Sequence, residues 1–452
     1  LNINKFYSIG YLAYEYLKMK KIKIENLNYE VEKYLNNFVR GGWVEVIQRG
    51  FFEKVYYYDV NSFYPFQISK LKDLSGAIFN FSKKIDDKSD YCYIECILSL
   101  KDDIDYSFLG FKDKDGVMKY GILKNVKYYL TKKEYETLKK YRMIEKIKIL
   151  KVLNVYLREK KYLFREIINE LYKNRRKNDE FLSYISKIIM NSVYGKFLES
   201  KKEFINFSFI DYLNNIDEDF KVNCYKHKFF RKDCVECREL NKIKNEIEKK
   251  EKINRIYFTS DRELMKSIDI AYGRLRNILY GIEVLANSRI YLFEILKNNF
   301  KNSDIIAVFT DGFFVKKRIR NKKLIGEKMG QLKEKKYKKL LMIGCGVYQA
   351  DNNLKIRGYN IKIDLFKEFK KNKNKKIIKL KSKELISLGR SIFTSKYNED
   401  DINKIKNILK EFDINFDKKR KFSEWTCRDF LVRNEKGKIL TFGLDKKFKK
   451  TV

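Results

Sequence analysis

The chain has 452 residues, of which 44% are hydrophobic and 15% aromatic, and this composition excludes an intrinsically disordered protein although 35% of the residues are charged. Its length allows more than one hydrophobic core, with roughly three domains as the prior expectation. The 100 Lys and Arg against 60 Asp and Glu give a net charge of +40, which favours a polyanionic partner such as nucleic acid, although an AT-rich genome would also enrich lysine.

The first residues, 1–21, lack the basic, apolar and small-residue order of a signal peptide. The chain also has no run of about 18 apolar residues of the kind that crosses a membrane. Seven cysteines in a chain of this length do not indicate a secreted disulfide scaffold. We therefore expect an intracellular protein with no membrane partner, in the host cytoplasm or in a mitochondrion.

The first clear element precedes Pro65, the one proline of the chain. The aromatic and β-branched run 55–58 predicts a strand, Asp59 follows it, and Pro65 indicates the beginning of a helix. Residues 91–98 predict a further strand, and we expect its two cysteines to lie in the core.

Helical periodicity extends over residues 155–196, and two helices joined near 174–179 would fit it. The charged segment 204–261 has the composition of an insertion, and an amphipathic helix is expected over 281–300. The sequence DIIAVFTDGFFVKK (304–317) has two apolar runs around a short turn, which predicts a β-hairpin. Basic runs and short apolar segments alternate through the rest of the chain.

Two carboxylates stand at the ends of predicted strands. Asp59 ends the first strand, and Asp311 lies in the turn of the hairpin. If these strands are neighbours in one sheet, the carboxylates converge, and oxygen ligands of this kind suit a pair of Mg²⁺ ions. A lone aspartate at a strand end is more often a turn residue, so the surrounding sequence has to decide between the two roles.

That surrounding sequence resembles the three polymerase motifs of family B DNA polymerases, in the correct order. YDVNSFYP (58–65) is similar to DxxSLYP, with Phe63 in place of Leu, and KIIMNSVYGK (187–196) is similar to KxxxNSxYG. The turn around Asp311 is similar to DTDS, with Phe309 in place of the first Asp and Gly in place of Ser. The resemblance implies a DNA-directed DNA polymerase in which Asp59 and Asp311 hold two catalytic Mg²⁺ ions.

The implied fold is α+β, a right-hand polymerase with an antiparallel palm sheet, helical fingers, a basic thumb and two insertions.

The nucleotide-binding candidates begin with Lys187, Asn191 and Tyr194, which follow the spacing i, i+4, i+7 and so share one helix face. By resemblance, Lys187 meets the triphosphate there. Tyr64 would stack under the deoxyribose and exclude a 2'-hydroxyl. Arg175 or Arg176 would be a further triphosphate contact, and a solvated helix face fits them equally. The implied nucleotide-binding residues are Ser62, Tyr64, Arg175, Lys187, Asn191 and Tyr194.

Other fragments resemble elements of the protein-primed members, the enzymes of phages, linear plasmids and organellar plasmids. VRGGWVEV (39–46) is similar to the YxGG element, with Val39 in place of Tyr. LANSR, which ends at Arg289, is similar to TxxAR, and Tyr348 keeps the aromatic of KxY while Gly346 replaces its Lys. The implied DNA-binding residues are Gly41, Gly42, Gly195, Arg289 and Tyr348.

The motifs divide the chain into seven expected regions. They are an N-terminal remnant with a YxGG-like linker (1–50), the first part of the palm (51–100), an insertion resembling a terminal-protein-binding region (101–155), the fingers (156–200), a second insertion (201–270), the second part of the palm (271–365) and the thumb (366–452). Because only a short segment precedes the YxGG-like element, we expect proofreading to be absent or supplied by a separate exonuclease. The expected partners are primer-template DNA, dNTPs and a terminal protein that primes replication of a linear plasmid or viral genome.

The second insertion contains a candidate structural zinc site. Its residues follow the spacing C-x2-H-x6-C-x2-C and include the only histidine of the chain: Cys224, His227, Cys234 and Cys237. Two ligand pairs with short internal spacing suit tetrahedral Zn²⁺. A cluster of unligated thiols is the alternative.

Two other classes of function stay open. A catalytically inactive DNA-binding remnant would fit the altered Val39, Phe309 and Gly346, whereas the retained Asp59 and Asp311 argue against it. A reverse transcriptase or RNA polymerase shares two-metal chemistry, but it would not be expected to carry the NSxYG motif together with the tyrosine of the first motif.

Overall fold

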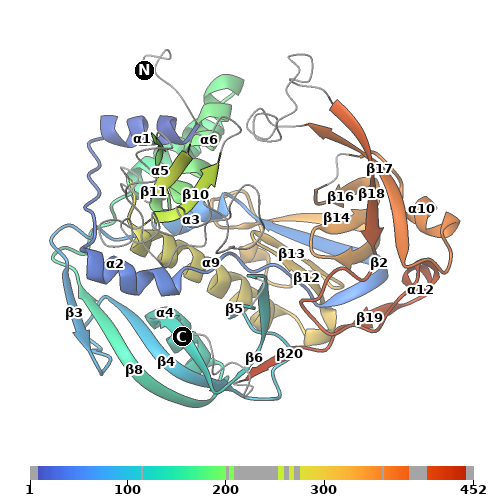
Figure 1. Cartoon of the computed structure of the whole chain (residues 1–452), viewed down its shortest axis with the longest axis horizontal. Helices are drawn as coiled ribbons and strands as arrows, with labels where there is room; N and C mark the ends of the chain where they lie inside the picture. Colours follow the sequence, from blue (N-terminus) through green and yellow to red (C-terminus); the bar gives the residue numbers. More distant parts are fainter. Residues whose placement is uncertain are drawn as a thin grey trace, which may run out of the picture. The chain divides into compact units, whose positions relative to one another are not determined.

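The structure is a computed structural model that describes residues 9–113, 116–199, 203–207, 253–258, 264–268, 275–358, 361–385 and 405–443 (Figure 1). The chain splits into two compact units, Leu1–Asn26 with Ser192–Ile278 and Leu27–Asn191 with Leu279–Val452. Among its described residues, the first unit contains α1, the end of α6 (Glu180–Phe197) and an antiparallel sheet in the order β10-β11-β9. These elements are α1 (Ile9–Met19), β9 (Glu203–Phe207), β10 (Ile253–Phe258) and β11 (Leu264–Ile268).

An eight-stranded antiparallel sheet lies at the centre of the second unit. Its order is β1-β12-β13-β2-β14-β15-β16, and β19 also pairs with β2. The strands are β1 (Glu45–Val46), β2 (Gln48–Val60), β12 (Ile305–Phe309), β13 (Gly312–Val315), β14 (Leu332–Gly344), β15 (Val347–Ala350), β16 (Asn353–Ile356) and β19 (Asn434–Lys436). Alternate residues face opposite sides: Phe313 and Val315 join one apolar cluster, and Phe314 joins another. Both faces of β13 are therefore buried, which fixes its register beside β2.

Three smaller sheets complete the β-structure of this unit, as far as the described residues show. The first is a four-stranded antiparallel sheet in the order β3-β8-β4-β7. In the second, β6 pairs in parallel with β20 on one side and antiparallel with β5 on the other, and in the third β17 pairs with β18. The strands are β3 (Ile78–Ser82), β4 (Tyr91–Leu100), β5 (Gly110–Lys112), β6 (Met118–Lys124), β7 (Val126–Thr131), β8 (Ile144–Tyr156), β17 (Ile377–Leu385), β18 (Ile405–Asp413) and β20 (Leu440–Gly443).

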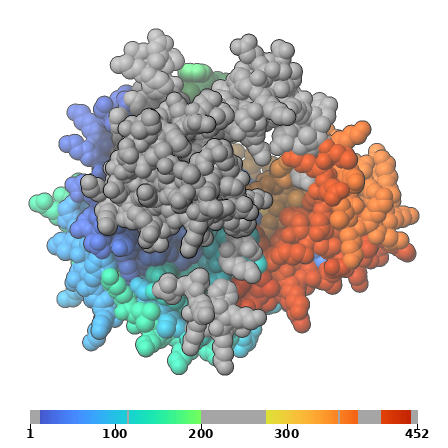
Figure 2. Space-filling view, in the orientation of Figure 1, coloured from blue at the N-terminus to red at the C-terminus, as the bar shows by residue number. Residues whose placement is uncertain are grey.

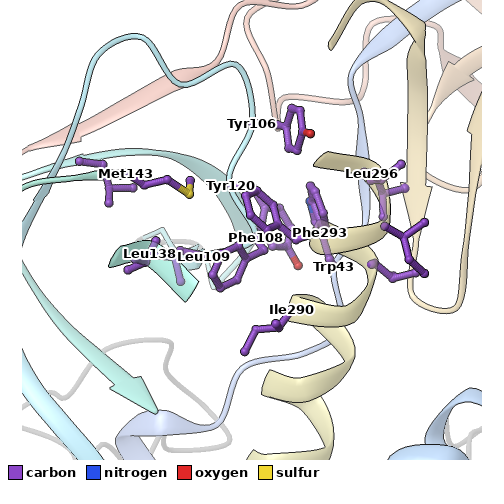
Figure 3. Close-up of a cluster of buried hydrophobic side chains, with 14 of the residues drawn as sticks. Trp43, Tyr106, Phe108, Leu109, Tyr120, Leu138, Met143, Ile290, Phe293 and Leu296 are labelled. Carbon is purple, nitrogen blue, oxygen red and sulfur yellow. The ribbon is translucent and has the colours of Figure 1, made fainter. Parts of the chain in front are cut away.

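The central helix of the second unit is α9 (Ile278–Asn299), and it is buried around most of its circumference. The helix expected over 281–300 is therefore present, but the expectation that it is amphipathic is wrong, because apolar residues occupy most of its sides. Its Ile290, Phe293 and Leu296 pack in one cluster with Trp43, with Phe108 just before β5 and with Tyr120 of β6 (Figure 3). The other helices are α2 (Tyr29–Leu35), α3 (Phe63–Ile68), α4 (Lys132–Lys140), α5 (Arg165–Arg175), α6 (Glu180–Phe197), α10 (Leu365–Lys371) and α12 (Cys427–Val432).

The C-terminal elements share a core with apolar residues of β14, β15 and β16 in the central sheet. Trp425 and Phe430 of the α12 region pack with Phe369 of α10 and with Ile378 and Leu380 of β17. In Figure 2 this part of the chain, coloured orange to red, forms one continuous region of the surface. The strand β19 connects it to the central sheet by pairing with β2.

Most predicted elements are present. The strand before Asp59, the helix around Pro65, the strand at 91–98, the hairpin at 304–317 and the helix at 281–300 are confirmed as β2, α3, β4, β12 with β13, and α9. The predicted helical stretch 155–196 is confirmed as α5 and α6, but it begins later because β8 runs to Tyr156. Strands β3 and β4, expected in the first part of the palm, pair with β8 and β7 and not with the central sheet. Of the helices that the structure describes, none has the length and apolarity needed to span a membrane.

Candidate active site

The two candidate catalytic residues, Asp59 and Asp311, lie on neighbouring strands of the central sheet. Asp59 is opposite Gly312 in the antiparallel pairing of β2 with β13, and Asp311 immediately precedes that glycine. The amide of Val60 donates a hydrogen bond of 2.8 Å to the carbonyl of Asp311. Residues far apart in the sequence are thus adjacent because the hairpin β12–β13 pairs with β2, as the sequence predicted.

The environment of these carboxyls opposes the accumulation of negative charge. Burial first, and then the charge of Asp311, raise the pKa of Asp59 to about 6, while Lys335 and Lys333 act in the opposite direction. Asp311 is exposed as a residue, yet burial of its carboxyl against the surrounding protein also raises its pKa. A divalent cation would favour the charged form of both carboxyls, so the donor set fits a cation with hard oxygen ligands.

The described residues contain no cluster of three or more His, Cys, Asp or Glu side chains that could hold a metal ion. Where the third motif's first aspartate is expected, Phe309 stacks on Tyr348, with ring centroids 5.5 Å apart. Metal ions at this place would therefore be coordinated by the two carboxylates together with phosphate and water oxygens. The four candidate zinc ligands lie outside the described residues, and the zinc site stays a prediction.

Tyrosines line the carboxylate pair. Burial raises the pKa of Tyr57 and Tyr348, the latter to about 12, and the negative charges of Asp59 and Asp311 add to the rise in both. Both hydroxyls therefore stay protonated at neutral pH. Tyr348, which the sequence analysis expects to bind DNA, thus lies close enough to the carboxylates for their charges to act on it.

Gly42 lies where three segments meet. A Cβ atom at this position would be 2.8 Å from Cγ2 of Thr310 and 3.0 Å from the hydroxyl of Tyr64, so the segment needs glycine here. Thr310 precedes Asp311, and Tyr64 lies on α3. The structure therefore brings the glycine pair, the aspartate turn and the predicted sugar-contacting tyrosine together, whereas Gly41 has open space where its Cβ would be.

Arg175, the last residue of α5, contacts the first motif. Its guanidinium donates a hydrogen bond of 2.6 Å to Oγ of Ser62, which precedes α3 with a φ of 47°. Arg175 and Lys333 line a cavity of about 610 Å³ between α5 and the start of β14, together with residues that include Arg176, Glu327 and Glu334. Lys333 is also the cross-strand partner of Asp59, so the cavity begins next to the carboxylate pair.

The remaining nucleotide-binding candidates lie on α6. Lys187 and Asn191 are exposed, one turn apart, and Tyr194 is half-buried. The helix passes from one compact unit to the other between Asn191 and Ser192. Lys187 and Asn191 therefore belong to the unit that contains the aspartates, and Tyr194 and Gly195 belong to the other.

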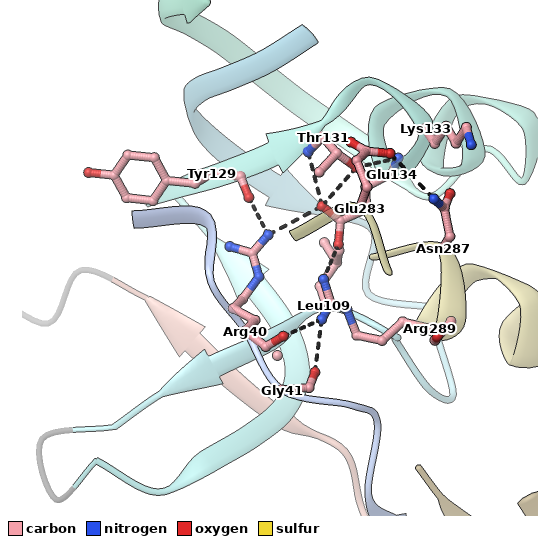
Figure 4. Close-up of polar contacts among 12 residues, drawn as sticks. Arg40, Gly41, Leu109, Tyr129, Thr131, Lys133, Glu134, Glu283, Asn287 and Arg289 are labelled. Atoms are coloured by element: carbon pink, nitrogen blue, oxygen red, sulfur yellow. Dashed lines mark hydrogen bonds and ion pairs between the residues drawn. The ribbon is translucent and has the colours of Figure 1, made fainter. Parts of the chain in front are cut away.

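Arg289, expected to contact DNA, is buried, with 1% of its surface exposed. Its guanidinium contacts Glu134 and the carbonyls of Arg40 and Gly41 (Figure 4). A direct contact with DNA would require the side chain to leave these partners. In this structure Arg289 supports the segment that carries the glycine pair.

The sequence prediction missed Lys333 and Lys335, which act on the charge of Asp59, and Glu134, which pairs with Arg289. The alternation of β14 could have indicated the two lysines, because residues two apart share a face of a strand. Glu134 completes a capping box with Thr131 at the start of α4, a pattern that the sequence shows. Its partners could not be predicted, because they come from distant segments.

A stability test follows from the raised pKa of Asp59. Since folding raises this pKa from 3.8 to about 6, the ionised carboxyl destabilises the folded chain, a penalty that is absent below about pH 4 and complete above about pH 6. We expect Asp59→Asn to raise the Tm at pH 7.5, in a chelating buffer, by an amount on the order of a few degrees. At pH 4 the difference should disappear.

The control for this test is Asp86→Asn. The pKa of Asp86 is lowered, mainly by hydrogen bonds from the Tyr156 hydroxyl and the Lys88 amide, so its removal should not stabilise the chain. Equal Tm changes in the two variants at pH 7.5, measured by differential scanning calorimetry, would contradict the proposed charge repulsion.

Comparisons with known proteins show which family the chain is similar to. The family described as DNA polymerase type B, organellar and viral, matches residues 1–271. A DNA polymerase from Acidianus bottle-shaped virus (isolate Italy/Pozzuoli) is 23% identical over 356 residues, which are 74% of this chain and 41% of the relative. The chain thus spans less than half the length of that curated relative.

The fold is similar to solved structures of the phi29 DNA polymerase. Its ternary complex with primer-template DNA and incoming nucleotide substrates has a TM-score of 0.59, with 13% identity, over 91% of this chain and 68% of that chain. The orthorhombic crystal form has the same TM-score and coverage, with 14% identity. At such identities the likeness shows the fold alone.

Proposed function

Because the chain belongs to the type B DNA polymerases of organelles and viruses, we propose that it catalyses template-directed DNA synthesis. The observation that carries the proposal is the pairing of β2 with β13, which brings Asp59 and the Asp311 turn together in the central sheet. In the reaction, a bond forms between the primer's 3'-oxygen and the α-phosphorus of a dNTP while the bond to pyrophosphate breaks.

Asp59 and Asp311 would hold two Mg²⁺ ions, which when bound activate the 3'-hydroxyl and neutralise the triphosphate. The raised pKa of Asp59 supports this role, since a cation relieves the repulsion between the carboxyls. Lys333 and Lys335 lower the same repulsion in part, and we propose that they also attract the phosphates of the substrates.

We assign the other nucleotide-binding and DNA-binding candidates by their positions in the structure. We propose that exposed Lys187 and Asn191 meet the triphosphate and the nucleotide, with Tyr194 and Gly195 continuing the same helix. Arg175, which is held by its hydrogen bond to Ser62, would bind the triphosphate in the cavity that it lines with Lys333. Tyr64, beside Gly42, would contact the deoxyribose, and Tyr348 would contact the DNA next to the carboxylates.

We further propose that the enzyme is protein-primed and replicates a viral or linear-plasmid genome. The organellar and viral family description and the phi29-like fold support this proposal. The region 101–155 contributes β5 to β7, α4 and most of β8, and it is the proposed contact for a terminal protein. A separate exonuclease is a further proposed partner.

The test is primer extension by the wild-type chain on a primed single-stranded template with Mg²⁺. We expect dNTPs to be incorporated in template order, and rNTPs to be used far less efficiently. Incorporation of rNTPs at equal efficiency would favour an RNA-synthesising enzyme. A folded chain that binds the primer-template but extends nothing would favour the inactive DNA-binding remnant.

A further inference from the structure

A buried ionic network lies beneath the glycine loop, defined here as Gly41 and Gly42. Arg289 donates to Oε1 of Glu134 at 2.7 Å, and its other terminal nitrogen donates to the carbonyls of Arg40 at 2.7 Å and Gly41 at 2.8 Å (Figure 4). Arg40 donates to Oε2 of Glu134 at 3.3 Å and to the carbonyl of Tyr129. The network therefore holds the chain of the glycine loop through its backbone.

The network places two positive charges and one negative charge inside the protein. Arg289, Glu134 and Arg40 are 1%, 0% and 7% exposed. Burial alone would raise the pKa of Glu134, but the charges of Arg40 and Arg289 outweigh it and keep that pKa below its usual value. Each arginine donates one hydrogen bond to a different oxygen of Glu134, and hydrogen bonds between charged groups are stronger than neutral ones.

A second contact holds the glycine loop from the neighbouring sheet. The hydroxyl of Tyr120, on β6, donates a hydrogen bond of 2.7 Å to the carbonyl of Gly42. On its other side, the Cβ position of Gly42 is 2.8 Å from Thr310 and 3.0 Å from the Tyr64 hydroxyl. Gly41 itself is exposed. The backbone of the loop is thus bonded to the buried side chains of Arg289 and Tyr120, and Gly42 lies next to the proposed catalytic turn and to Tyr64.

We propose that Arg289 and Tyr120 are positioning residues, which hold the glycine loop so that it sets the places of the Asp311 turn and of Tyr64. The inference rests on the proposed polymerase function. Neither residue touches DNA or nucleotide in this role, because both side chains are buried and bonded to protein. Loosening the loop should therefore change how the site recognises the sugar, and it should leave the electrostatic binding of DNA unchanged.

The first experiment removes one hydroxyl. Tyr120→Phe deletes the bond to the carbonyl of Gly42, and Tyr128→Phe is the matched control, because the buried Tyr128 hydroxyl donates to the carbonyl of Gly110 at the same distance of 2.7 Å. In single-nucleotide incorporation assays, we expect the kcat/KM ratio of dNTP over rNTP to fall roughly fivefold or more in Tyr120→Phe. The ratio should stay at the wild-type value in Tyr128→Phe.

The second experiment separates positioning from DNA contact. Arg289→Gln removes a charge, so a direct phosphate contact would reduce the slope of log affinity against log salt concentration by about 1. We expect the slope for primer-template binding to stay as in the wild type, while sugar discrimination falls as in Tyr120→Phe. A reduced slope would overturn the positioning role of Arg289. If Arg289→Gln fails to fold, the Tyr120→Phe result still decides.

A third measurement does not depend on activity. Amide hydrogen exchange should become faster in Tyr120→Phe at residues 41–44 and also at the turn 310–312, and it should not do so in Tyr128→Phe. Faster exchange in the glycine loop alone would contradict the coupling to the catalytic turn. If the wild type extends primers while both tyrosine variants behave alike, the inference fails and the proposed function stands. If the wild type is inactive, the exchange result still tests the coupling.

Discussion

Asp59→Asn and Asp311→Asn are each expected to reduce primer extension by roughly a thousandfold or more, because each removes one of the two carboxylates proposed to hold the catalytic Mg²⁺ ions. The amide keeps the shape of the side chain but loses its charge. Phe309 stands where the resembled motif has a further aspartate, so in the described part of the site no third carboxylate is placed to compensate. Single-turnover extension with saturating dNTP measures the effect on the chemical step.

Two controls separate lost chemistry from lost structure. Primer-template affinity should be retained in both variants, since removing a negative charge does not weaken the attraction to phosphates. The Asp59→Asn variant should also be at least as heat-stable as the wild type, as argued above from its raised pKa. Asp86→Asn should extend primers normally. Wild-type rates in either catalytic variant would end the proposal that these carboxylates form the active site.

Glu134→Ala is expected to have the largest effect on stability, about 3–5 kcal/mol of unfolding free energy. The replacement leaves Arg40 and Arg289 buried without their shared carboxylate, and it also removes the capping box of α4. Urea unfolding followed by circular dichroism measures the change. A loss below about 1 kcal/mol would show that the buried network contributes little to folding.

The control for Glu134 is Glu294→Ala. Glu294 also forms an ion pair, with Lys140 at 2.6 Å, but both side chains are partly exposed. Such pairs contribute about 0–1 kcal/mol to the free energy of unfolding. The pH dependence gives a second check. Since folding lowers the pKa of Glu134, its stabilisation is complete above about pH 4.5 and is lost as the pH falls through the folded-state value. The difference between wild type and Glu134→Ala should therefore shrink in acid.

Local patterns were enough to predict the elements that carry the candidate site. The aromatic run before Asp59, the apolar runs around Asp311 and the helical spacing of Lys187 and Asn191 each depend on residues within a few positions of one another. The strand, the hairpin and the helix therefore appear as predicted. The pairing of the two aspartates was a conditional prediction, since it needed β13 to lie beside β2, and the structure confirms that condition.

Only the tertiary structure decided the surroundings of these residues. The sequence by itself determined the two candidate carboxylates, the helix of the second motif and the excess of positive charge. These features follow from local residue patterns and from composition, and they need no knowledge of which distant segments meet. The structure decided that Arg289 is buried under the glycine loop with Glu134 and Arg40, and that Lys333 lies opposite Asp59. Burial and cross-strand partners depend on which distant segments meet, and no local pattern specifies that.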